Sequence, residues 1–77
     1  MSKKIPALKP KTVLNILLRI DFYIHHQRGS HIQLHHRTKT NLRVTIPLHT
    51  NFDLPAQLIL SILRQADLTR KEFLNLL

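Results

Sequence analysis

Residues 22–36, FYIHHQRGSHIQLHH, decide the fold of this chain. Apolar and polar side chains alternate on both sides of Gly29, the only glycine, which is the pattern of two antiparallel strands joined by a turn at residues 28–30. The apolar side chains that share one face are Phe22, Ile24, Ile32 and Leu34. The stretch therefore predicts a β-hairpin with one apolar and one polar face.

The polar faces of the two strands fix a register, because a slip by one residue would turn every side chain to the other face. If these faces coincide, the connection at Arg28, Gly29 and Ser30 has three residues. The expected pairs are then Gln27 with His31, His25 with Gln33, and Tyr23 with His35.

The flanking sequence adds a third strand and a helix. Leu42, Val44 and Ile46 alternate with polar residues before Pro47, which predicts another antiparallel strand. Upstream, apolar residues at helical spacing follow Pro10 and predict a helix from about Lys11 to Ile20. The helix should end at Asp21, a residue that tolerates the left-handed conformation better than most.

Two more helices are expected after the sheet. Pro55 suits a first helical turn with Asp53 or Leu54 as its cap, and an apolar stripe follows. The members of the stripe are Leu58, Ile59, Ile62, Leu63 and Ala66. Thr69 and Glu72 form a capping box that opens a short helix from Arg70 to Leu77.

The expected fold is α+β, with the order α-β-β-β-α(-α) in one domain over residues 1–77. Helices should cover one face of a three-stranded antiparallel sheet and leave the other open, an architecture that resembles a double-stranded RNA-binding domain. The side chains expected on the open face are Tyr23, His25, Gln27, His31, Gln33, His35, Arg43 and Thr45.

The charge balance indicates a polyanionic partner. Lys and Arg number 12 against 4 Asp and Glu, a formal net charge of +8, and residues 1–40 hold eight of these cations with Asp21 as their single acid. The absence of cysteine excludes disulfides and a thiol nucleophile. No apolar run is long enough for a membrane span or a signal peptide, so we expect a cytoplasmic protein.

The motif Gly29-Ser30-His31, preceded by Arg28, is the most specific candidate site. Glycine lets backbone N–H groups approach a phosphate, and serine and arginine add donors. His31 could exchange a proton with a ribose 2′-OH or a leaving 5′-oxygen. The plainer interpretation, which the residues alone favour, is that His31 binds phosphate or begins a strand. The cations expected to attract RNA are Lys3, Lys4, Lys9, Lys11, Arg28, Arg37 and Lys39.

Histidine clustering raises the alternative of a metal site. His25, His31 and His35 should share one face, but no carboxylate is near to support them as ligands. Neighbouring histidines on a strand point to opposite faces, so solvated sheet residues are expected at 25, 26, 35 and 36. We expect neither a metal nor a small-molecule cofactor.

Three separate stretches in the right order resemble the HicA (YcfA-like) toxins, the small mRNA interferases of HicAB toxin–antitoxin modules. The matching segments are Gln27-Arg28-Gly29-Ser30-His31, Val44-Thr45-Ile46-Pro47-Leu48-His49, and Ser61-Ile62-Leu63-Arg64-Gln65-Ala66 followed by Glu72-Phe73-Leu74. The resemblance runs from Ile5 to Leu77. It departs from the family pattern at Asp21 and Asp67, where glycine is usual, and at Thr50-Asn51.

The resemblance implies a metal-independent endoribonuclease that cleaves mRNA with His31 as its catalytic residue. It also implies a HicB-type antitoxin that covers this surface. The residues expected to bind RNA are Arg28, Gly29, Ser30, Lys9, Lys11, Arg37, Lys39 and Arg43. The alternative is a non-catalytic RNA-binding module that uses the same basic sheet face.

Overall fold

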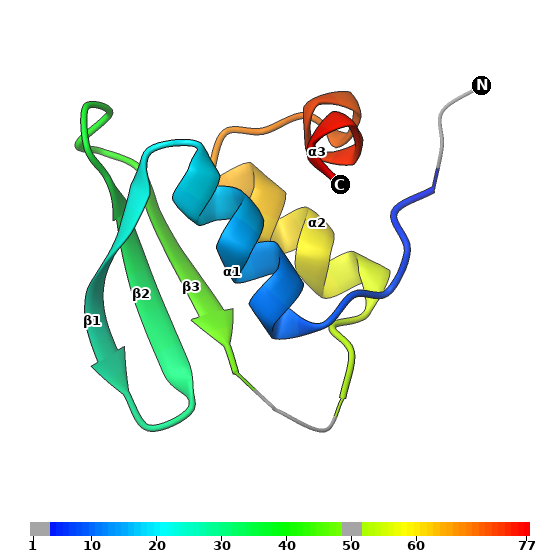
Figure 1. The fold of residues 1–77 in the computed structure, drawn as a ribbon, viewed down its shortest axis with the longest axis horizontal. Coiled ribbons are helices and arrows are strands. Elements are labelled where there is room, and N and C mark those ends of the chain that lie inside the picture. The colour runs from blue at the N-terminus through cyan, green and yellow to red at the C-terminus, as the bar shows by residue number, and fades with distance from the viewer. Residues whose placement is uncertain (1–3, 49–51) are drawn as a thin grey trace.

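A computed structural model describes residues 4–48 and 52–77 of the chain. The elements are α1 (Pro10–Arg19), β1 (Phe22–Arg28), β2 (His31–His36), β3 (Arg43–Pro47), α2 (Ala56–Gln65) and α3 (Arg70–Leu76). The strands form an antiparallel sheet in the order β1-β2-β3, with the helices packed on one side (Figure 1). The predicted element order and α+β class are confirmed. No helix within the described ranges is long and apolar enough to cross a membrane.

Helix α1 begins and ends where its sequence predicts. Pro10 lies in the first turn behind Lys9, where the missing N–H costs no hydrogen bond. The chain leaves the helix through Asp21, whose φ of 74° lies in the left-handed region. The Asp21 carbonyl accepts a hydrogen bond from the Arg37 N–H at 2.9 Å, which joins this turn to the end of β2.

The core lies between the sheet and the helices. Val13 and Leu17 from α1 pack with Leu34 of β2 and with Phe73 of α3, and all four side chains are fully buried. Burial of each such side chain contributes about 1.5–3 kcal/mol of transfer free energy. Ile24 was expected on this side, and it pairs with buried Leu34, yet it is 45% exposed because β1 is an edge strand.

The predicted register of the first hairpin is wrong over half its length. Tyr23 pairs with His35 as expected, but Arg28, not Gln27, pairs with His31, and the loop has two residues instead of three. The extra residue is a β-bulge at His25, between the pairs that Ile24 and His26 make.

The bulge lets the chain form a two-residue turn at Gly29 and still keep the apolar residues of β1 and β2 on the same side of the sheet. Gly29 has a φ of +58° and Ser30 does not, so the turn has the two-residue form with glycine at its first position. A regular ladder from such a turn would place His25 opposite Leu34 and turn Ile24 to the polar side. The unpaired His25 restores the pairing of Ile24 with Leu34. It also shifts the pairing of residues 26–28 by one position relative to the prediction.

The start of α2 also differs from expectation. Leu54 is held in an antiparallel bridge with Leu8, so the helix begins later, behind Pro55, without a side-chain cap. Asp53 makes an ion pair with Lys9 at 3.4 Å instead of capping. The turn expected at residues 49–51, and His49 with it, lie outside the described residues.

The third helix confirms the predicted capping box. The Thr69 side chain accepts the Glu72 N–H at 3.1 Å, and the Glu72 carboxylate accepts the Thr69 N–H at 2.9 Å. Phe73 is the buried anchor of this helix, whereas Leu77 is 53% exposed beyond its end.

Candidate histidine site and nucleic-acid interface

The turn between β1 and β2 presents the candidate histidine. Ser30 is exposed in the turn, and its carbonyl accepts the Leu48 N–H, which ties the end of β3 to the hairpin. His31 begins β2 and pairs with Arg28 on one side and with Pro47 on the other. The structure therefore brings Arg28, Gly29, Ser30 and His31 together at one exposed edge of the sheet.

The bulge at His25 determines which side chains accompany His31. Paired residues project to the same side of a sheet, so Arg28 shares a side with His31, while Gln27 pairs with Ile32 on the helix side. We call the uncovered side the open face. Its side chains are Tyr23, His25, His26, Arg28, His31, Gln33, His35, Arg43 and Thr45. The expected Gln27 is thus replaced by His26 and Arg28.

The open face carries no acidic residue. Asp21 lies in the turn before β1, and Asp53 is paired with Lys9 beside the helices. Asp67 and Glu72 lie near α3, on the helix side of the sheet. This separation leaves Arg28 and Arg43 as the formal charges that the strands contribute to the open face, and Arg37 of the β2–β3 loop adds a third beside the Tyr23 ring, which favours a polyanion.

The histidines at the centre of the face stack instead of converging on an ion. The His25 and His35 rings are 3.9 Å apart and within 10° of parallel, so they present their faces to each other. Within residues 4–48 and 52–77, no three His, Cys, Asp or Glu side chains are grouped so that they could hold a metal ion.

The other predicted RNA-binding residues are dispersed. Lys9 and Lys11 are exposed at the start of α1 on the helix side, where Lys9 already pairs with Asp53. Arg37 and Lys39 lie in the β2–β3 loop, at the opposite end of the sheet from the β1–β2 turn (Figure 1). Arg43 is on the open face and pairs with His35. Of the predicted set, only the residues of the β1–β2 turn, Arg28, Gly29 and Ser30, immediately surround His31.

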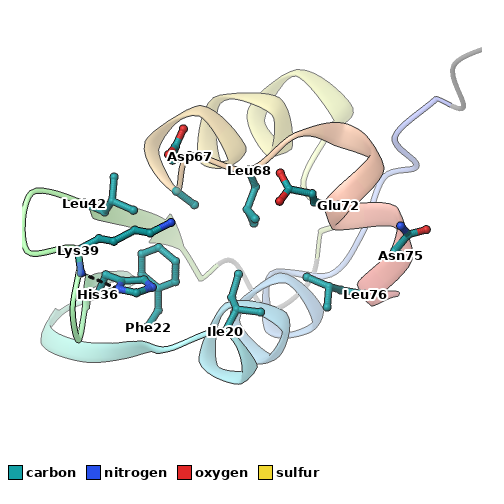
Figure 2. Close-up of a pocket in the computed structure, with 11 residues that line it drawn as sticks. Ile20, Phe22, His36, Lys39, Leu42, Asp67, Leu68, Glu72, Asn75 and Leu76 are labelled. Atoms are coloured by element: carbon teal, nitrogen blue, oxygen red, sulfur yellow. Dashed lines mark hydrogen bonds between the residues drawn. The ribbon is translucent and has the colours of Figure 1, made fainter.

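A hollow of about 400 Å³ lies away from the open face, between the end of β2 and α3 (Figure 2). Two of its polar side chains, His36 and Glu72, are already engaged in the fold. His36 Nδ1 accepts the Lys39 N–H at 2.9 Å and the Thr38 N–H at 3.2 Å. Glu72 belongs to the capping box, and the pKa of its carboxyl is lowered by the Thr69 backbone and side-chain hydrogen bonds and by nearby Lys39.

The role of His36 corrects the expectation of a solvated sheet residue. It pairs with Phe22 and contacts that ring edge-on, at 4.8 Å between centroids and 90° between planes. Its Nδ1 accepts hydrogen bonds from backbone N–H groups of the β2–β3 loop, so the ring holds that loop against the end of β2. The open face, and not this hollow, is therefore the candidate functional site.

Comparison with known proteins identifies the family of the chain. A search of curated proteins finds no match. A scan against protein-family models matches residues 10–68 to the HicA toxin of bacterial toxin–antitoxin systems. The match spans α1, the whole sheet and α2, and so includes the hairpin with His31. It supports a toxin role and implies an antitoxin partner. This chain belongs to the HicA toxin family.

Proposed function

We propose that the chain is a metal-independent endoribonuclease that cleaves mRNA on the open face of its sheet. The observation that carries the proposal is the pairing of His31 with Arg28 beside the Gly29-Ser30 turn. An exposed imidazole lies there on the same side of the sheet as a forked cation, on a face without carboxylates. Membership of the HicA toxin family supports a nuclease toxin.

In this proposal His31 moves one proton in the cleavage of a phosphodiester. It either removes the proton of a ribose 2′-OH, whose oxygen attacks the adjacent phosphorus, or protonates the 5′-oxygen that leaves when the P–O5′ bond breaks. Arg28 holds a non-bridging phosphate oxygen, and Ser30 donates from the turn. Proton transfer by a positioned side chain contributes a factor of about 10²–10⁴ in rate.

The proposed partner is a HicB-type antitoxin that covers the open face. A partner that neutralises a basic, acid-free surface should present carboxylates to Arg28 and Arg43. Because the substrate is mRNA, the activity belongs in the cytoplasm.

Expression in a bacterial host tests the toxin function. Wild type should arrest growth and deplete mRNA, and co-expression of the antitoxin encoded beside it should restore both. His31→Ala should be harmless while keeping the circular dichroism spectrum and thermal midpoint of wild type. Growth arrest by folded His31→Ala, or its absence with wild type, would overturn the proposal.

A further inference from the structure

Four side chains contact one another in a chain on the open face, away from the β1–β2 turn. His25 stacks on His35, and the Tyr23 ring meets His35 edge-on at 6.1 Å and 70°. The Arg37 guanidinium lies 5.3 Å from the centre of the Tyr23 ring. We call this patch the aromatic platform, defined by Tyr23, His25, His35 and Arg37.

The platform is not part of the core. All three helices pack on the other side of the sheet, so nothing in the described chain covers it (Figure 1). His25 is exposed, and Tyr23 and His35 are half-buried by one another. His35 Nε2 is covered yet has no hydrogen-bond partner, which costs stability. Stability alone therefore does not explain why these rings lie together.

The charges around the platform suit a stacking ligand that carries phosphate. Burial lowers the pKa of His35, and His25 and Arg43 lower it further, so at neutral pH this ring is uncharged and stacks without repulsion. Arg37 and Arg43 flank it with fixed positive charge. A planar base on the rings and a phosphate on an arginine would satisfy both features.

The platform is also placed to share one ligand with His31. Both lie on the open face along β2, and the four residue steps from His31 to His35 span about 13 Å. A short single strand can cover that distance. Only unpaired bases offer their faces to a protein, which selects single-stranded over double-stranded RNA.

We propose that the aromatic platform is a stacking site for a nucleobase of single-stranded RNA. The base belongs to the same strand as the phosphodiester at which His31 transfers a proton. The inference rests on the proposed function for the identity of the ligand. Within it, His25 supplies the outer stacking surface, His35 and Tyr23 hold that ring in place, and Arg37 and Arg43 bind the backbone. The platform thus favours unpaired segments of mRNA.

Binding measured by fluorescence anisotropy tests this site on the wild-type chain and its variants. The first probe is a short single-stranded 2′-O-methyl RNA, in which the blocked 2′-oxygen prevents cleavage. The second is an abasic strand with the same number of phosphates. His25→Ala removes the stacking surface, and His25→Phe keeps a ring without nitrogens. His26→Ala is the matched control, because His26 is an exposed neighbour on the same face outside the platform.

We expect His25→Ala to weaken binding of the base-bearing strand about tenfold or more. His25→Phe and His26→Ala should stay within about twofold of wild type, and the abasic strand should bind all four proteins equally. Nuclear magnetic resonance of wild type gives a readout that needs no variant: the base-bearing strand should shift the ring protons of His25, and the abasic strand should not.

Equal binding of the base-bearing strand by His25→Ala and wild type would overturn the platform, as would an equal loss on both probes. Either result leaves the nuclease proposal standing if wild type cleaves unmodified mRNA. Failure of wild type to bind either probe would overturn both proposals.

Discussion

Arg28 and His31 pair directly across the first hairpin, on the side of the sheet that no helix covers. This relationship depends on the bulge at His25, since a three-residue loop would have paired Gln27 with His31. A guanidinium thus lies beside the imidazole that begins β2. In the proposed function, this pairing joins phosphate binding by Arg28 and proton transfer by His31 at one point of the surface.

Removal of the Arg28 charge should weaken RNA binding and its dependence on salt. For single strands, each phosphate contact contributes about 0.7 to the slope of log K against log salt concentration. Arg28→Gln should reduce the magnitude of this slope by about that amount, measured by anisotropy over a salt series.

The matched control is Arg70→Gln, which removes the same charge from the exposed start of α3, on the helix side. Its slope should equal that of wild type. Equal losses in the two variants would mean that RNA senses net charge and not the hairpin site.

Replacement of Asp67 by glycine should stabilise the fold. Asp67 has a φ of 57°, where a side chain costs free energy that glycine avoids. We expect Asp67→Gly to raise the free energy of unfolding by roughly 0.5–1 kcal/mol, measured by urea denaturation.

Asp67→Asn separates backbone from charge, because asparagine also tolerates the left-handed region but carries no carboxylate. It should remain close to wild type. A gain as large as that of glycine would assign the effect to the lost charge.

The capping box should make stability fall in acid. The lowered pKa of Glu72 means that its contribution is fully present above the unfolded value of 4.5 and is lost as pH falls through the folded pKa. Glu72→Gln should therefore be less stable than wild type at pH 7, and the gap should close towards pH 3. A gap that does not change with pH would refute an ionised cap. Thr69→Ala should cost about 1 kcal/mol at neutral pH.

The surroundings of His35 on the open face should lower its pKa. Burial, then His25 and Arg43, lower the pKa of His35, so it should protonate below 6.5. The unfolded chain takes up this proton first, and stability is therefore lost as pH falls below 6.5 through the folded pKa. His25→Ala should raise the pKa of His35, as followed by its imidazole resonances, whereas His26→Ala should not. A wild-type His35 that titrates at or above 6.5 would contradict the stacked arrangement.

The arrangement of elements could be predicted from the sequence because each depends on a local pattern. Apolar spacing after Pro10, alternation around Gly29 and the Thr69–Glu72 capping box each depend on residues close together in the chain. The structure contains all three elements at the predicted places in the chain, although the hairpin differs from the prediction in its register. Asp21 and Asp67, the two positions at which the sequence departs from the glycines that the resemblance implies, both adopt the left-handed conformation that favours glycine.

The sequence places Arg28 and His31 on either side of one turn, but it does not fix their pairing. Alternation shows that one residue between Ile24 and Ile32 is unpaired, and it cannot say whether that residue lies in the turn or in the strand. The unpaired residue lies in strand β1, at His25, and for this reason Arg28 pairs with His31. The cap at Asp53 failed for a similar reason, because the long-range bridge between Leu8 and Leu54 delays the helix.

Cleavage of a long mRNA by purified protein in EDTA tests the role of His31 most directly. Wild type and His26→Ala should cut the RNA, whereas His31→Ala should bind it and cut at least 10²-fold more slowly. Cutting by His31→Ala at the wild-type rate would contradict the account. Binding without cleavage by wild type would also contradict it, and would leave an RNA-binding module on the same face.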